Sequence, residues 1–205
     1  MDNFKSAVIL AGGKSSRMEF DKQCLFINKK RLIFEVARKL EKHFDDITIV
    51  TNKKEYYKDC KYNLVSDEMK NMGPLAGISV GLKQSLSNYV YIIACDMPNI
   101  DDRYIRYMKN KIKKDIKSKK TFDIYIPKVN NRIQLFQGFY KKELEHEINE
   151  YLLYSSKRSI ISFFDRTNKK VSYIDEREFK EHKFRNDMFI NLNTKEDLNI
   201  YEKGI

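Results

Sequence analysis

The stretch Val8–Gln23 constrains this chain most, because an apolar run ends there in a polar loop that contains two adjacent glycines. Ala7–Leu10 is long enough for a buried strand and too short for a core helix. Gly12 and Gly13 lack a Cβ, so the backbone can adopt positive φ angles, approach a ligand closely and aim its N–H groups at an anion. The loop also carries three cationic side chains, those of Lys14, Arg17 and Lys22. The sequence therefore predicts a loop that binds a polyphosphate.

Two common phosphate-binding motifs do not account for this loop. The P-loop has a glycine five residues before the glycine of Gly-Lys-Ser, and in this chain that position is Val8. The dinucleotide motif G-x-G-x-x-G is also absent from the stretch. A strand-to-helix turn with solvated basic residues is the simpler alternative, so the polyphosphate interpretation needs support from the rest of the chain.

The length of 205 residues suits a single domain, 1–205, with a substantial core. No apolar run approaches the roughly 20 residues that cross a bilayer, and Met1–Ser6 shows no basic region followed by an apolar one. We therefore expect a cytoplasmic protein with no membrane partner. The three cysteines are widely spaced, as are the histidines, which argues against a disulfide framework, a zinc site or a Cys–His nucleophile pair.

The formal charge of +11 raises the question of a nucleic-acid partner. The lysines are spread through the chain, however, and the densest run, Lys109–Lys120, is interrupted by Ile112 and Ile116 at helical spacing. That pattern is typical of the solvated face of an amphipathic helix. We expect no nucleic-acid partner, although a basic surface also favours anionic small molecules.

Strands and helices alternate in the first half of the chain. Apolar residues recur at helical spacing over Leu32–His43, and a second helix begins at Pro74. Ile47–Val50, Tyr62–Val65 and Tyr89–Ala94 read as strands. This alternation predicts an α/β fold in which parallel strands are joined by right-handed crossovers.

The second half of the chain is less regular. Phe122–Pro127 and Ile133–Tyr140, on either side of Asn130-Asn131, predict a small antiparallel excursion from the mostly parallel sheet. Phe189–Leu192 reads as a further strand. Thr194 follows as a plausible N-cap of the last helix.

Polar residues follow three of the predicted strands, at the sheet edge where ligands of such folds lie. Asp96 comes directly after the most clearly buried strand, and a carboxylate beside a polyphosphate is what Mg²⁺ uses, so Asp96 is the best candidate for a metal ligand. Its alternative role is a cap of the following turn. Asn52 could bond a base or ribose, and Asp67 could contact the nucleotide, but either could also simply close its own loop.

Glycines near the second helix indicate a close approach. Gly77 is compatible both with a ligand at the helix and with tight packing of the helix on the sheet, whereas for Gly81 we expect packing.

The first loop resembles the signature L-A-G-G-x-S-x-R-M-x-x-D-K of the small nucleotidyltransferases, and within them the molybdenum cofactor guanylyltransferases. The matching residues are Leu10, Ala11, Gly12, Gly13, Ser15, Arg17, Met18, Asp21 and Lys22. Later segments also resemble that family in order along almost the whole chain: Asp67, Gly73–Gly77, Cys95–Pro98, Asn191–Thr194 and Glu196–Leu198.

The resemblance implies a Rossmann-like three-layer sandwich that transfers GMP from GTP to the phosphate of the molybdopterin-bound molybdenum cofactor. The products would be the guanine dinucleotide and pyrophosphate, and the cofactor of the reaction Mg²⁺. The chain would divide into a GTP-binding half, about 1–120, and an acceptor-binding half, about 121–205. Cofactor-delivery proteins or acceptor enzymes would be further partners.

The resemblance also implies roles for individual residues. Catalysis would rest on Lys22, Asp96 and Arg17, with Asp96 also binding the metal. The nucleotide-binding residues would be Leu10, Ala11, Gly12, Gly13, Lys22, Asn52, Asp67 and Asp96. The acceptor-binding residues would be Gly77, Arg158, Asn191 and Asn193.

Three departures from the family pattern argue against carrying all of these roles over to this chain. Glu19 replaces the usual glycine, Val50 occupies a position that is often polar, and the usual proline near Gln134-Leu135 is missing. The related cytidylyltransferases read L-A-A-G at the first loop, so Ala11-Gly12-Gly13 favours GTP over CTP. The sequence is also compatible with an enzyme that uses a sugar or polyol phosphate acceptor, and with a non-catalytic nucleotide-binding module.

Overall fold

A computed structural model of the chain describes residues 3–11, 22–27, 29–58, 60–67, 69 and 72–203. For Lys22 and Lys195 it describes the backbone alone. The predicted site residues Gly12, Gly13 and Arg17 therefore lie outside the described residues, as does Glu19.

One mixed sheet forms the centre of the molecule, with the strand order β10-β7-β9-β6-β1-β4-β5 and β8 paired to β7. Its first four strands in the sequence are mutually parallel, which confirms the α/β prediction. In the part of this sheet that the structure describes, β8 and β9 run in the direction opposite to the other strands. The strands are β1 (Ser6–Leu10), β4 (Asp46–Val50), β5 (Asn63–Val65), β6 (Tyr89–Ala94), β7 (Ile124–Val129), β8 (Arg132–Ile133), β9 (Gly138–Lys141) and β10 (Val171–Asp175).

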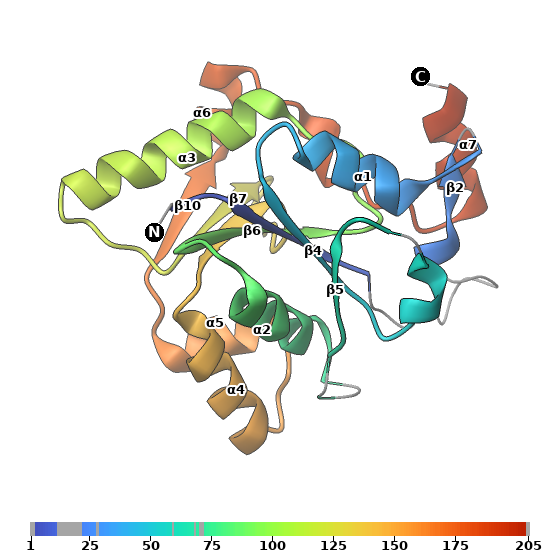
Figure 1. Ribbon diagram of the computed structural model, residues 1–205. Coiled ribbons are helices and arrows are strands. Elements are labelled where there is room, and N and C mark those ends of the chain that lie inside the picture. Colours follow the sequence, from blue (N-terminus) through green and yellow to red (C-terminus); the bar gives the residue numbers. More distant parts are fainter. Residues whose placement is uncertain are drawn as a thin grey trace.

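Helices cover both faces of this sheet, so the fold is a three-layer sandwich (Figure 1). Helices α1 (Leu32–Leu40), α3 (Asp102–Lys117) and α6 (Glu176–His182) pack on one face. Helices α2 (Pro74–Gln84), α4 (Leu144–Tyr154) and α5 (Ile160–Thr167) pack on the other. The last helix, α7 (Lys195–Lys203), lies beside a separate hairpin of β2 (Phe26–Ile27) and β3 (Lys30–Arg31).

Two hydrophobic cores result from the alternation of side chains along the central strands. In β1, Ala7 and Ile9 point into the core beneath α1 and α3, whereas Val8 and Leu10 point into the core beneath α2 and α4. Burial on both faces explains why β1 is an uninterrupted run of buried residues. Among the described residues, no helix combines the length and apolarity needed to cross a membrane.

Two predictions about the second half are wrong. Ile133–Tyr140 is not one strand: it splits into β8 and β9, and Gln137 between them has φ of +58°. The predicted antiparallel excursion itself is confirmed, because β8 and β9 run antiparallel to the strands that they pair with, and β9 lies inside the main sheet, between β6 and β7. Phe189–Leu192 is not a strand either, because a 3₁₀ turn occupies Asn186–Phe189 and the chain beyond it joins no strand of the sheet.

The packing of α2 on the sheet accounts for both of its glycines. A Cβ on Gly81 would lie 2.5 Å from Val8 Cγ1, so any larger residue would force Val8 to shift, and Gly81 serves packing as the sequence predicts. A Cβ on Gly77 would lie 3.3 Å from Leu10 Cδ2 and 3.7 Å from Val50 Cγ1. Gly77 therefore faces the sheet and lets α2 lie close to the ends of β1 and β4.

Candidate functional site

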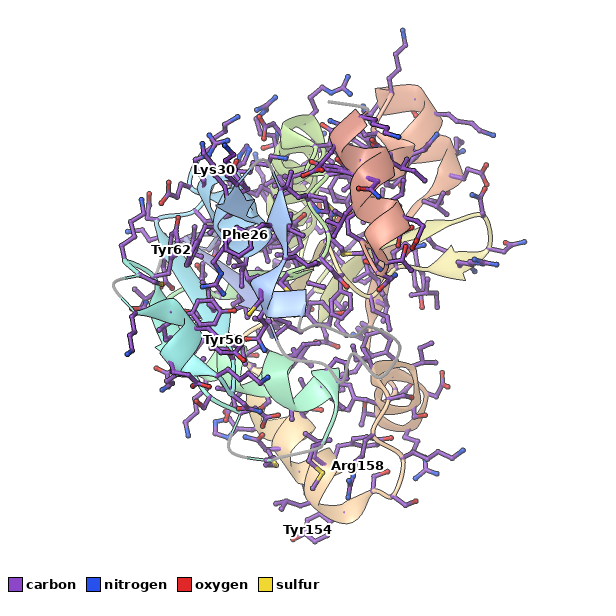
Figure 2. All side chains as sticks on the ribbon, turned by 90° about the vertical axis from the view of Figure 1, so that its right-hand side faces the viewer. Phe26, Lys30, Tyr56, Tyr62, Tyr154 and Arg158 are labelled. Atoms are coloured by element: carbon purple, nitrogen blue, oxygen red, sulfur yellow. The ribbon has the colours of Figure 1, made fainter. Side chains whose placement is uncertain are left out.

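The parallel strands β1, β4, β5 and β6 end at one edge of the sheet, and Figure 2 looks onto it. Leu10 at the end of β1 pairs with Val50 of β4 and with Ala94 of β6. The hydrogen-bonded ladder continues one residue further, since Ala11 N–H donates to Val50 O at 2.9 Å and Cys95 N–H donates to Leu10 O at 3.0 Å. We call this side of the sheet, with Leu10, Ala11, Asn52, Asp67 and Asp96, the carboxyl edge.

Asp96 lies where the sequence predicts a metal ligand. Asp96 is the second residue after β6, and it is only 8% exposed. Among the described residues, no group of three His, Cys, Asp or Glu side chains could hold a metal ion. A single carboxylate still suits Mg²⁺, which is commonly bound through one or two carboxylates together with substrate phosphates and water.

Asn52 and Asp67 come together at the neighbouring part of the carboxyl edge. The N–H of Asp67 donates to Asn52 Oδ1 at 3.1 Å, so the loops after β4 and β5 are joined directly. The Asp67 carboxylate accepts from Met69 N–H at 2.9 Å. Burial raises the pKa of Asp67, and the hydrogen bond from Met69 offsets part of that rise. A carboxylate held partly desolvated at a strand end is a plausible ligand for donor groups of a nucleoside.

The segment that carries the predicted acceptor residues lies directly against Asp96. Leu192 N–H donates to the backbone carbonyl of Asp96 at 2.9 Å, and Leu192 is flanked by Asn191 and Asn193. This hydrogen bond brings the predicted metal ligand, Asp96, next to the predicted acceptor-binding segment, which lies almost a hundred residues later in the chain.

Two further contacts fasten this C-terminal segment along the chain after β6. Arg185 N–H donates to Asp101 Oδ2 at 3.0 Å, and Asn99 Nδ2 donates to Asp187 O at 3.1 Å. Burial alone would raise the pKa of Asp101, but hydrogen bonds from backbone N–H groups and from the Arg103 side chain outweigh burial and lower that pKa below its usual value.

Gln137 is a buried polar residue that the sequence analysis missed. Its side-chain Nε2 donates to Asn99 O at 3.1 Å and also to Met188 O, while its Oε1 accepts from Tyr91 OH at 3.2 Å. One glutamine thus joins β6, the loop after it and the C-terminal segment. Its signal in the sequence is weak, because an isolated glutamine between two short strands usually faces solvent.

Asn191 and Asn193 are exposed at the start of α7. Asn193 N–H donates to Asp197 Oδ2 at 2.8 Å, and Asn193 Nδ2 donates to Asn191 O at 3.4 Å. Thr194 Oγ1 accepts from Asp197 N–H at 3.0 Å, which confirms Thr194 as a helix cap. The cap fixes the backbone of this turn, so the asparagine side chains are held at the surface beside the segment that bonds Asp96.

Arg158 lies at the opposite end of the carboxyl edge from the aromatic group around the β2–β3 hairpin (Figure 2). The carbonyl oxygen of Arg158 is 3.7 Å from where a Cβ on Gly73 would be, so this turn lies beside the start of α2. Phe26 and Tyr56 are the exposed aromatic residues at the other end of the edge, where Figure 2 also shows Lys30. The structure thus brings together Leu10, Ala11, Asn52, Asp67, Asp96, Asn191 and Asn193, with Arg158 further out and Gly77 beneath the edge, facing the sheet.

Known proteins resemble this chain over nearly its whole length. The family model of the MobA-like NTP transferase domain matches residues 7–171. The chain is 45% identical over 202 residues to a probable molybdenum cofactor guanylyltransferase of Peptoclostridium acidaminophilum, covering 98% of this chain and 89% of the relative. It is 38% identical over 200 residues to the molybdenum cofactor guanylyltransferase of Syntrophotalea carbinolica, covering 98% and 91%.

Solved structures share the fold. The crystal structure of molybdopterin-guanine dinucleotide biosynthesis protein A from Archaeoglobus fulgidus superposes with a TM-score of 0.78 at 22% identity, over 97% of both chains. The 4-diphosphocytidyl-2C-methyl-D-erythritol synthase of Anaerococcus prevotii gives 0.69 at 14% identity, over 99% of this chain and 98% of the other. At these identities the similarity establishes the α/β nucleotidyltransferase architecture.

Proposed function

We infer the reaction from family membership, because this chain belongs to the molybdenum cofactor guanylyltransferases of the MobA-like NTP transferase family and is a nucleotidyltransferase. We propose that it transfers GMP from GTP to the terminal phosphate of the molybdopterin-bound molybdenum cofactor. The products are the guanine dinucleotide form of the cofactor and pyrophosphate. Proteins that deliver or receive the cofactor are the further partners of this proposal.

One observation carries the proposal. The Asp96 backbone accepts from Leu192 N–H, so a carboxylate suited to a metal–triphosphate complex and the asparagines assigned to the acceptor meet at one edge of the sheet. Two substrates must lie side by side for a direct phosphoryl-group transfer, because most of the acceleration comes from positioning and from neutralising charge.

The proposed GTP site covers the ends of β1, β4, β5 and β6. Lys22 and Arg17, with the backbone N–H groups of Gly12 and Gly13, hold the triphosphate. Asn52 and Asp67, joined by the hydrogen bond between them, contact the nucleoside together with Leu10 and Ala11.

The proposed metal ion is Mg²⁺, held by the Asp96 carboxylate and by phosphate oxygens of GTP. When bound, it supplies neutralisation of the charge that develops on the phosphates. Asp96 fits this role because it is a carboxylate held at a strand end, 8% exposed, on the edge that faces the substrate.

The acceptor-binding half positions the molybdopterin cofactor, whose phosphate is the nucleophile. Asn191, Asn193 and Arg158 hold the pterin, and Gly77 contributes by allowing α2 to approach Leu10. An oxygen of the acceptor phosphate attacks the α-phosphorus of GTP, a new P–O bond forms, and the bond from the α-phosphorus to the bridging oxygen breaks. Pyrophosphate leaves with that electron pair, and no enzyme nucleophile is required.

The test is a substrate panel. The purified protein is incubated with Mg²⁺, the molybdopterin cofactor and either GTP or CTP; pyrophosphate is quantified and the product identified by mass. We expect pyrophosphate and guanine dinucleotide with GTP and little turnover with CTP. Equal use of CTP, or turnover only when a sugar or polyol phosphate replaces the cofactor, would overturn the proposal. GTP binding without turnover of any acceptor would indicate a non-catalytic module.

The acceptor assignment has its own test. Asn191→Ala should raise the KM for the cofactor about fivefold or more while the KM for GTP stays unchanged, since a lost hydrogen bond is worth about 1 kcal/mol. The matched control is Asn186→Ala, an exposed asparagine in the same C-terminal segment. Unchanged cofactor KM in Asn191→Ala would contradict the assignment.

A further inference from the structure

Gln23 follows Lys22 in the 3₁₀ turn Lys22–Cys24, and it is buried although its neighbour Cys24 is exposed. Only 5% of Gln23 is exposed. Its side-chain Oε1 accepts two hydrogen bonds, from Thr51 Oγ1 at 2.5 Å and from Tyr57 OH at 3.1 Å. Both donors belong to the segment after β4, so a residue adjacent to the proposed phosphate-binding lysine is tied to the neighbouring strand end.

Arg31 reinforces the same connection. Its Nη2 donates to the backbone carbonyl of Gln23 at 2.7 Å, and its Nη1 donates to Tyr56 O. The guanidinium carbon lies 4.7 Å from the centroid of the Tyr57 ring. The turn that contains Lys22 is therefore held to the 3₁₀ turn Lys54–Tyr57 through the backbone as well as through the glutamine side chain.

Thr51 connects this anchor to the nucleoside side of the site. Its hydroxyl donates to Gln23 and accepts from Lys53 N–H at 3.0 Å, so it shapes the loop that carries Asn52. Asn52 in turn accepts from Asp67 N–H. Gln23, the residue beside Lys22, is thus connected to Asp67 by hydrogen bonds at both ends of the short backbone segment 51–53, from Thr51 to Gln23 and from Asp67 to Asn52.

We propose that Gln23 is a positioning residue that fixes Lys22 relative to Asn52, so that the phosphate end and the nucleoside end of one nucleotide are bound in a fixed spacing. This inference rests on the proposed function, because it requires that Lys22 binds phosphate and that Asn52 and Asp67 bind the nucleoside. Gln23 itself touches neither end. Its removal weakens the contribution of the phosphates to binding and leaves the nucleoside contribution in place.

The experiment compares the dissociation constants of GTP and GMP, each measured with Mg²⁺ on the full chain. The ratio Kd(GMP)/Kd(GTP) reports what the β- and γ-phosphates add to binding. Gln23→Leu should lower this ratio about fivefold to tenfold through weaker GTP binding, because both side-chain hydrogen bonds that hold the Lys22 turn are lost. GMP affinity should stay close to that of the unmodified protein. Tyr57→Phe, which removes one of the two donors to Gln23, should lower the ratio by a smaller factor.

Thr48→Val is the matched control. Thr48 lies in β4, three residues before Thr51, and its buried hydroxyl has no hydrogen-bond partner within the described part of the chain. The ratio should be unchanged in Thr48→Val. A purely structural role of Gln23 predicts that Gln23→Leu lowers the melting temperature and weakens the binding of GTP and of GMP by the same factor, and that result overturns the inference. If Gln23→Leu does not fold, the same comparison is made with Tyr57→Phe. A protein that does not bind GTP at all contradicts the proposed function instead.

Discussion

Substitution of Gly81 by alanine tests the packing of α2 on the middle of β1, where Gly81 faces Val8. A Cβ at position 81 would lie 2.5 Å from Val8 Cγ1, 2.9 Å from Val8 Cγ2 and 3.2 Å from Val8 Cβ. Val8 cannot rotate away easily, because a β-branched side chain has few χ1 rotamers and this one is fully buried in a strand with partners on both sides.

The expected cost follows from two opposing effects. Inserting a methyl group into a well-packed core costs about 1–3 kcal/mol. Alanine in place of glycine in a helix interior stabilises the helix by about 0.8–1.0 kcal/mol. We therefore expect Gly81→Ala to lower the free energy of unfolding by about 0.2–2 kcal/mol, which corresponds to a fall of up to about 8 °C in Tm for a chain of this size.

A double-mutant cycle identifies the cause. Val8→Ala alone should destabilise by about 1.5–3 kcal/mol, because it removes two buried methyl groups and leaves a cavity. In the Val8→Ala background the two short contacts with the γ-methyl groups are gone and only the 3.2 Å contact with Cβ remains, so Gly81→Ala should become much less destabilising or neutral. Urea unfolding of the four proteins, followed by circular dichroism, measures the coupling energy. A destabilisation by Gly81→Ala that is the same in both backgrounds, or no destabilisation in either, would refute the packing explanation.

Three further predictions concern polar groups that are buried, as for Gln137 and Asp101, or half-buried, as for Asp67. Gln137→Leu leaves Asn99 O and Met188 O without their donor, so it should lower the free energy of unfolding by about 2–5 kcal/mol in urea titrations, and a loss below about 1 kcal/mol would contradict that role. The pKa of Asp101 is lowered in the folded protein, so its carboxylate stabilises the fold above about pH 4 and loses this effect as the pH falls through that pKa. The difference in Tm between the unmodified protein and Asp101→Asn should therefore shrink below about pH 4. A difference in Tm that does not change with pH would contradict this role of Asp101. Burial raises the pKa of Asp67, so its negative charge destabilises the fold at neutral pH. Asp67→Asn should therefore raise Tm, and it should weaken GTP binding about tenfold or more. A lower Tm together with unchanged GTP binding would contradict both expectations.

The first half of the fold could be predicted because its sequence pattern is local. The buried strand Tyr89–Ala94 and the helix that begins at Pro74 lie where apolar periodicity and a proline at a helix start put them. The rule that parallel strands gather ligands at their carboxyl ends then correctly placed Asn52, Asp67 and Asp96 on one edge, although nothing in their own neighbourhoods distinguishes a ligand from a turn cap.

The second half depended on contacts between distant residues. Gln137 interrupts Ile133–Tyr140 with a positive φ because its side chain bonds carbonyls near residues 99 and 188, which no local pattern reveals. Phe189–Leu192 has the composition of a strand, yet Leu192 N–H bonds Asp96 O in a loop. Gln23 resembles a solvated loop residue and is instead buried beneath Thr51 and Tyr57.

The most direct test of the proposed active site is metal binding in the presence of the nucleotide. Mn²⁺ replaces Mg²⁺, and free Mn²⁺ is titrated by electron paramagnetic resonance with the protein and GTP, for the unmodified chain, Asp96→Asn and Asp123→Asn. Asp123 is the control carboxylate, since it precedes β7 and lies at the opposite edge of the sheet. We expect the unmodified protein and Asp123→Asn to bind Mn²⁺ equally and Asp96→Asn to bind it about tenfold more weakly or worse, as expected for a lost charged ligand. Equal Mn²⁺ binding by all three proteins would contradict the assignment of Asp96 as the metal-binding residue of this edge.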